Sequence, residues 1–158
     1  MKTLTLGAAA VAAVLFLAPA SALSHCQVPC GIYDDSARVH ALLEDAVTIE
    51  KAMRLIGELA DHDDPQSLNQ LTRWINTKET HAANVIAVVS EYFLTQKVKP
   101  VDGKGRDAYL ESLADHHAVM RAAMKCKQTV DRGNVESLRE AIQRMARHYE
   151  VAHDHHHH

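Results

Sequence analysis

The sequence lacks several patterns that mark other classes of protein. No segment alternates polar and apolar residues with a period of two, so no β-sheet is expected. The net charge is only -3 in 158 residues, which gives no reason to expect nucleic acid as a partner. The chain also lacks the Cys-x-x-Cys-His pattern of covalent haem and the pair of Glu-x-x-His motifs of a di-iron bundle. These absences favour a helical fold, and a functional site other than a covalent haem or a di-iron centre.

The N-terminus contains an apolar run with the features of an export signal. Lys2 precedes an apolar stretch from Leu4 to Ala20, and Ala22-Leu23-Ser24 has the small-x-small pattern that signal peptidase recognises. The run is too short and too rich in alanine for a secure membrane span, which needs ~20 strongly apolar residues. We therefore expect residues 1–24 to be a signal peptide, with rival cleavage sites within residues 18–22 and an uncleaved anchor as the alternative. The cleaved protein would be exported to a periplasm, a lumen or the extracellular space, without stable membrane anchoring.

Residues 34–152 show apolar positions at helical spacing. A first helix is expected from Asp34 or Asp35 to about residue 61, and a second from Asp64, as N-cap before Pro65, to about residue 94. Proline and two glycines make residues 96–106 the longest loop. A third helix then runs to about residues 131–133, and Asn134 caps a fourth. Helices joined by mostly short turns favour an all-α fold, an antiparallel up-down-up-down four-helix bundle.

Each expected helix has one apolar face that should point into the core. On the third helix, this face includes His117 beside methionines, which we interpret as core packing with His117 hydrogen-bonded at a bundle end. Cys126 is expected to be a buried, inert thiol. The four faces are Leu42, Ala46, Ile49, Met53 and Ile56; Leu68, Leu71, Ile75, Ala82, Val85 and Val89; Leu110, Leu113, His117, Met120 and Met124; and Val135, Leu138, Ile142, Met145 and Tyr149.

The segment His25-Cys26-Gln27-Val28-Pro29-Cys30-Gly31-Ile32-Tyr33 places one imidazole and two thiols directly after the expected cleavage site. A disulfide between Cys26 and Cys30 is the default for an exported protein. A redox dithiol fits less well, because the spacing is not Cys-x-x-Cys. In a third interpretation, cleavage before His25 frees an α-amine that joins the imidazole, the thiolates and the Cys26 amide around one ion. Nitrogen and sulfur donors in tetragonal geometry favour nickel or copper ahead of zinc.

The order His-Cys-x-x-Pro-Cys-Gly-x-Tyr resembles the nickel-binding hook of nickel superoxide dismutase at every fixed position, here residues 25–33. Glu91-Tyr92-Phe93 is similar to a second landmark of that family. The resemblance implies a homohexamer with one nickel ion per subunit, converting superoxide to dioxygen and hydrogen peroxide by Ni(II)/Ni(III) cycling. It also implies a square plane made by the α-amine of His25, the amide of Cys26 and the sulfurs of Cys26 and Cys30. The His25 imidazole would be the axial ligand.

The resemblance implies further roles around this hook. Pro29, preceded by a cis peptide bond, would shape the turn that returns Cys30 to the metal. Gly31 would allow the backbone to turn sharply away from the metal site. Gln27 and Val28 complete the hook, and Tyr33 and Tyr92 would stand over the open face.

Three other residues correspond to positions that support the metal in the family. His40, or Glu44 one turn on, would contact the axial imidazole, and His81 takes the place of an arginine. His81 and Tyr92 are ~16 Å apart along one helix, so only neighbouring subunits could bring both to one metal. The other functions left open are an exported nickel or copper carrier without turnover, and a structural bundle with a disulfide. Residues 153–158 form a His-rich tail, either a cloning remnant or a nickel-collecting segment.

Overall fold

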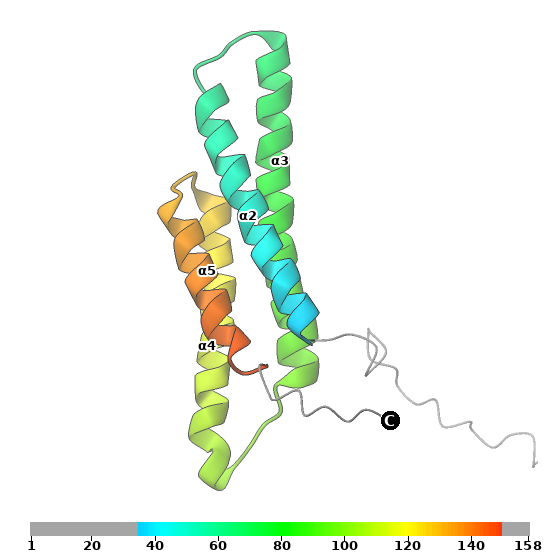
Figure 1. Cartoon of the computed structure of the whole chain (residues 1–158), viewed down its shortest axis with the longest axis vertical. Helices are drawn as coiled ribbons and strands as arrows, with labels where there is room; N and C mark the ends of the chain where they lie inside the picture. Colours follow the sequence, from blue (N-terminus) through cyan, green and yellow to red (C-terminus); the bar gives the residue numbers. More distant parts are fainter. Residues whose placement is uncertain (1–34, 150–158) are drawn as a thin grey trace, which may run out of the picture.

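The computed structural model describes residues 35–149. The expected signal peptide, the hook at residues 25–33 and the His-rich tail lie outside the described residues. The described part contains helices and no strand, namely α2 (Asp35–Leu59), α3 (Pro65–Ala87), the π-helix η1 (Val88–Lys97), the short 3-10 helix η2 (Gly103–Gly105), α4 (Arg106–Gln128) and α5 (Gly133–Ala146). α2 packs against α3 and α5, and α4 packs against α3 and α5. The result is the expected antiparallel up-down-up-down bundle (Figure 1).

Two predicted helix starts had different outcomes. The start of α3 is confirmed, because the Asp64 carboxylate accepts hydrogen bonds from the backbone N–H groups of Gln66 and Ser67, and Pro65 is the first helical residue. The predicted cap of α5 is wrong. The helix already begins at Gly133, whose N–H donates to the Asp131 carboxylate at 2.9 Å. Asn134 instead donates through its side chain to Thr129.

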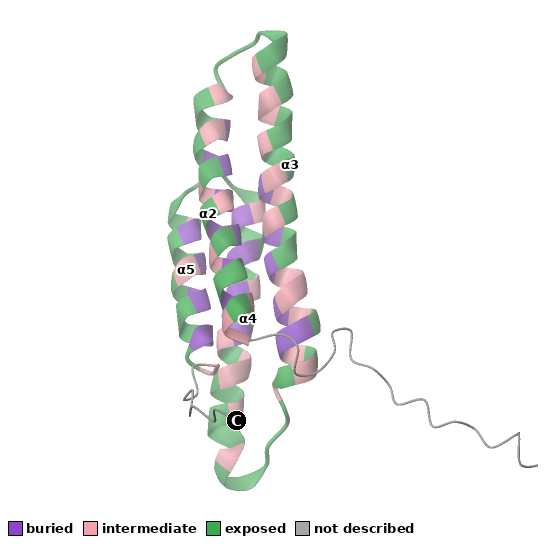
Figure 2. Ribbon diagram, turned by 45° about the vertical axis from the view of Figure 1, so that its right-hand side comes forward, coloured by how far each residue is buried: buried purple, intermediate pink, exposed green. Residues whose placement is uncertain are grey.

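The predicted core faces are confirmed for α2 and α5. All five predicted α2 residues are buried, as are four of the five on α5, with Tyr149 half-buried against them. Figure 2 shows these buried positions facing one another inside the bundle. These two helices therefore supply the regular part of the core.

The predicted faces of α3 and α4 are partly wrong. Leu68 and Ile75 are exposed because the α2–α3 hairpin extends beyond α4 and α5, so the first half of α3 has only α2 beside it (Figure 1). On α4 the core-facing positions carry small residues such as Val119 and Ala123. The larger side chains of Leu110 and Met124 are exposed, and they lie on a neighbouring face. No helix within residues 35–149 is long and apolar enough to cross a membrane.

Candidate metal centre and the end of the bundle beside it

Within residues 35–149, no group of three or more histidine, cysteine, aspartate or glutamate side chains could hold a metal ion. Cys126 is buried, as predicted, and burial raises the pKa of its thiol to about 11, so it is protonated at neutral pH and unsuited to ligation. The predicted ligands His25, Cys26 and Cys30 lie outside the described residues.

The remaining hook residues, Gln27, Val28, Pro29, Gly31 and Tyr33, also lie outside the described residues. Their connection to the bundle nevertheless limits where they can be. Cys30 precedes Asp35, the first residue of α2, by five positions, which a chain can span by at most ~18 Å. The end of the bundle where α2 begins is called the hook end below, because the candidate ligands precede it in the sequence.

At the hook end, Asp35 joins two side chains of η1. The hydroxyl of Tyr92 donates to Asp35 Oδ1 at 2.5 Å, and Lys97 Nζ lies 2.9 Å from the same oxygen. The guanidinium of Arg38 lies 4.2 Å from the centre of the Tyr92 ring, and Lys97 Nζ lies 5.3 Å from it. Tyr92 is only 6% exposed. The structure thus places the predicted Tyr92 beside Asp35, the first residue of α2.

The π-helical winding of η1 explains how Lys97 reaches this position. The N–H of Val98 donates to the carbonyl of Phe93, five residues earlier, at 3.0 Å. A π-turn is wider than the 3.6-residue turn of an α-helix, so residues five apart approach the same side. Lys97 follows Tyr92 by five positions and contacts the same carboxylate. Nothing in the sequence of residues 88–97 signals this winding.

The protonation states at the hook end follow from these contacts. Burial, followed by the hydrogen bond to Asp35, raises the pKa of Tyr92, while the nearby Lys97 acts in the opposite direction. The Asp35 carboxylate in turn raises the pKa of Lys97. At neutral pH Tyr92 is therefore a neutral phenol and Lys97 a cation.

A buried aromatic cluster connects the hook end to the core. Phe93 packs edge-on against Tyr92, with ring centres 5.0 Å apart, and lies 4.5 Å from the Tyr149 ring. His116 is fully buried, and its Nδ1 donates to the carbonyl of Ser112 at 2.6 Å. Because Nδ1 carries the proton, Nε2 accepts the hydrogen bond from the Tyr149 hydroxyl at 2.5 Å. Burial lowers the pKa of His116 and keeps the ring neutral.

His116 corrects one prediction from the sequence. We expected His117 to point inward, but His117 is exposed and its neighbour His116 occupies the core. The physical reason is the same as for Met124: the inner face of α4 is defined by small residues. The core face predicted from the larger residues of α4 was therefore displaced by one position.

The predicted supporting residues lie on α2 and α3. His40 and Glu44 are exposed, one turn apart on α2. His81 on α3 contacts the buried Asp45 of α2, with Nδ1 2.6 Å from Oδ1, and the Asn84 side chain donates to the other oxygen at 2.7 Å. The sequence analysis missed Asp45, although an acidic residue three positions after Leu42 falls on the apolar face.

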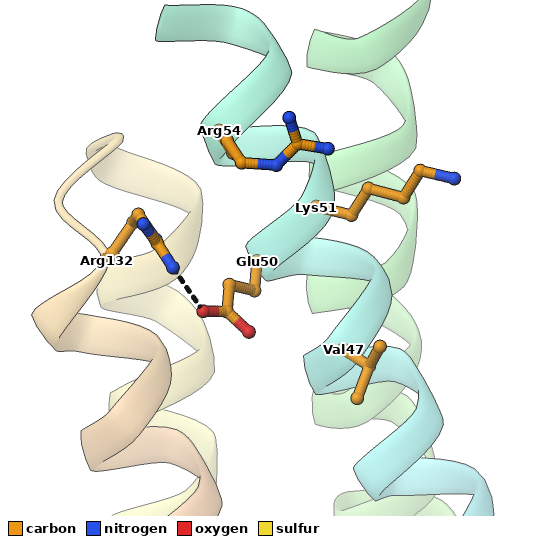
Figure 3. Close-up of a pocket in the computed structure, with 5 residues that line it drawn as sticks. All are labelled: Val47, Glu50, Lys51, Arg54 and Arg132. Atoms are coloured by element: carbon orange, nitrogen blue, oxygen red, sulfur yellow. Dashed lines mark hydrogen bonds and ion pairs between the residues drawn. The ribbon is translucent and has the colours of Figure 1, made fainter.

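Shallow hollows lie on the surface of residues 35–149, and two of them are lined by charged residues. One, of about 200 Å³, lies at the hook end, where Arg38, Glu91 and Tyr92 are among its lining residues. The other, of about 260 Å³, lies beside the middle of α2 and contains Glu50 (Figure 3). Hydrogen bonds from Arg132 at 2.7 Å and Arg139 at 2.6 Å lower the pKa of Glu50. That hollow is an ion-pair site between α2 and α5.

A family model of nickel-containing superoxide dismutases matches residues 20–152. The match includes the whole candidate hook and nearly all of the bundle. Comparisons with curated proteins and with solved structures found no match.

Proposed function

The chain belongs to the nickel-containing superoxide dismutases, and from this membership we propose that its nickel is bound by His25, Cys26 and Cys30. The protein is an oxidoreductase that converts superoxide to dioxygen and hydrogen peroxide. The proposed donors are the α-amine and imidazole of His25, the amide nitrogen of Cys26 and both sulfurs. The observations that support this location are that the family match includes the whole of residues 25–33, and that the remaining thiol, that of Cys126, is buried and protonated.

The donor set fits nickel chemically. Bound nickel supplies a one-electron couple between Ni(II) and Ni(III), since anionic sulfur and amidate nitrogen stabilise the higher state. Pro29 and Gly31 would shape the turn, and the backbone of Gln27 and Val28 sets the separation of the two cysteines. We further propose that the free amine arises by removal of residues 1–24 during export.

Tyr33 and Tyr92 are proposed to restrict access to the open face of the metal. Tyr92 is suited to this because Asp35 holds its hydroxyl and Arg38 and Phe93 pack against its ring. Tyr33 is two residues from Asp35, so it is covalently bound to the same end of the bundle. A fixed ring beside the metal would limit access to small species such as water, superoxide and peroxide.

We also propose that His40 or Glu44 supports the His25 imidazole, since a ligating imidazole is usually fixed by a hydrogen bond to its second nitrogen. His81 would act from a neighbouring subunit of a homohexamer. Its Nδ1 is bound to Asp45, which fixes the ring so that Nε2 is the atom left for such a contact. An unchanged rate and pH profile in His81→Ala would remove His81 from the mechanism.

The metal location is tested on the exported, mature protein. Intact mass should give His25 as the first residue, two unoxidised hook thiols and one nickel ion. Superoxide consumption should be insensitive to cyanide and abolished, together with nickel binding, in Cys26→Ser. Cys126→Ser is the matched control: it should retain nickel and turnover while losing stability, because it places a hydroxyl in the core. A different first residue, or nickel retained by Cys26→Ser, would contradict the assignment.

A further inference from the structure

The Asp35 carboxylate restricts what Tyr92 can do at the hook end. A phenol has a single O–H donor, and that of Tyr92 is directed at Asp35 Oδ1 at 2.5 Å. A hydrogen bond from a hydroxyl to a carboxylate is charge-assisted and stronger than a neutral one. While Asp35 is ionised, Tyr92 can therefore accept a hydrogen bond from a molecule beside the metal but has no proton to donate to an anion.

Lys97 has the donors that Tyr92 lacks. Its ammonium group has three N–H bonds, and one is directed at Asp35. Even with a second directed toward Tyr92, the third has no protein partner among residues 35–149 and can meet a ligand. The Lys97 side chain is 34% exposed, so a small anion can reach it without displacing core residues.

The other charged groups at this end are less suited to meeting an anion. The Arg38 guanidinium lies over the face of the Tyr92 ring at 4.2 Å, and Glu91, beside the same hollow, repels anions. Asp35 is itself negative and is shared by Tyr92 and Lys97. Lys97 is consequently the cation that combines exposure with a fixed position next to Tyr92.

We propose that Lys97 is the side chain through which this end of the bundle binds the substrate anion, and that Asp35 is the positioning residue that holds both Lys97 and the Tyr92 hydroxyl. The inference rests on the proposed location of the nickel at residues 25–30. The ring of Tyr92 then restricts access to the metal, and the ammonium group of Lys97 orients superoxide.

Azide, a small anion, serves as the probe on the nickel-loaded full-length mature protein, with its dissociation constant measured by calorimetry. Lys97→Met should weaken azide binding about tenfold, the usual effect of losing a charge-assisted hydrogen bond at a partly exposed site. Lys97→Arg should restore most of the affinity. Tyr92→Phe should change it by less than about twofold, since the lost hydroxyl had no free proton. Lys99→Met, two residues beyond the end of η1 and exposed, is the matched control and should behave as wild type.

Weaker azide binding in Tyr92→Phe, together with unchanged azide binding in Lys97→Met, would overturn the proposal. So would an absence of azide binding to the wild type. Retention of nickel by Cys26→Ser contradicts the metal location instead, so the two failures are distinguishable.

A second measurement tests the role of Asp35 without turnover or nickel. Tyrosines labelled at the ring carbon that carries the hydroxyl would be titrated by NMR, with Tyr92→Phe identifying the Tyr92 signal. Asp35→Ala should lower the pKa of Tyr92 and Lys97→Met should raise it, because the two groups act on the phenol in opposite directions. Shifts of the same sign, or none, would show that Asp35 and Lys97 do not share the Tyr92 hydroxyl.

Discussion

The two ends of the bundle differ in how far they bury their side chains. At the hook end, α2 begins beside η1, and Asp35, Tyr92 and Phe93 are linked by a hydrogen bond and by ring contacts. At the other end, called the hairpin end, α2 and α3 extend beyond α4 and α5 and leave Leu68 and Ile75 exposed (Figure 1). The structure therefore links polar and aromatic side chains at the end where α2 begins, and leaves apolar side chains exposed at the hairpin end.

Removing a ring from the hook end is the strongest test of this difference. Phe93→Ala should cost about 3–5 kcal/mol in the free energy of unfolding, because the side chain is fully buried and contacts Tyr92, His116 and Tyr149. Ile75→Ala, at the hairpin end, should cost less than about 1 kcal/mol because the side chain is already exposed. Urea unfolding of both variants measures the comparison. Equal losses would show that the two ends do not differ in stability.

The next largest effect is expected from the hydroxyl of Tyr149. In Tyr149→Phe the packing remains, but Nε2 of the buried His116 loses the group that donates to it. A buried acceptor without a partner costs about 1–3 kcal/mol. Tyr109→Phe, on the half-buried surface of α4, is the control and should stay within about 0.5 kcal/mol. A loss in Tyr149→Phe no greater than in the control would mean that the His116–Tyr149 bond does not stabilise the fold.

His116 also makes the stability depend on pH. Burial lowers its pKa in the folded protein below the ordinary 6.5, so the unfolded chain binds the proton more tightly. This contribution is fully present above pH 6.5 and is lost as the pH falls from 6.5 toward the folded pKa. The free energy of unfolding should therefore fall between pH 7.5 and 5.5. His116→Gln should show a flatter dependence over the same range, and an unchanged slope in that variant would assign the effect to other groups.

The sequence predicted the bundle more completely than its irregular parts. The apolar residues predicted to face the core from α2 and α5 repeat regularly and are buried, and Tyr149, just after α5, is half-buried. On α4 the inner face is made of small residues, so size misled the choice between His116 and His117. The π-helical turn at residues 88–97 has no proline or glycine to mark it, and it is this turn that brings Lys97 to Asp35.

The chemistry was predictable for a different reason. The donors of the candidate site are contiguous in the sequence, at residues 25–30, so their proximity does not depend on folding. The polar contacts within the bundle do depend on it. Asp35 and Tyr92, which share a hydrogen bond, are 57 residues apart, and the buried Asp45 meets His81 only once α2 and α3 have packed. Contacts of this kind depend on the relative rotation of two helices, which a single stripe of apolar residues does not define.

The smallest effect is expected between the two ends, at the hollow of Figure 3. Glu50→Gln removes the charge that holds Arg132 and Arg139, but these groups are partly exposed and screened, so the loss should be about 0.5–1 kcal/mol. It should shrink in high salt. Because the arginines lower the pKa of Glu50 below 4.5, the wild-type contribution is present above that pH and disappears as the pH falls through the folded value. Nickel binding and superoxide consumption should not change. If either does change, the hook depends on the middle of the bundle as well as on the end where α2 begins.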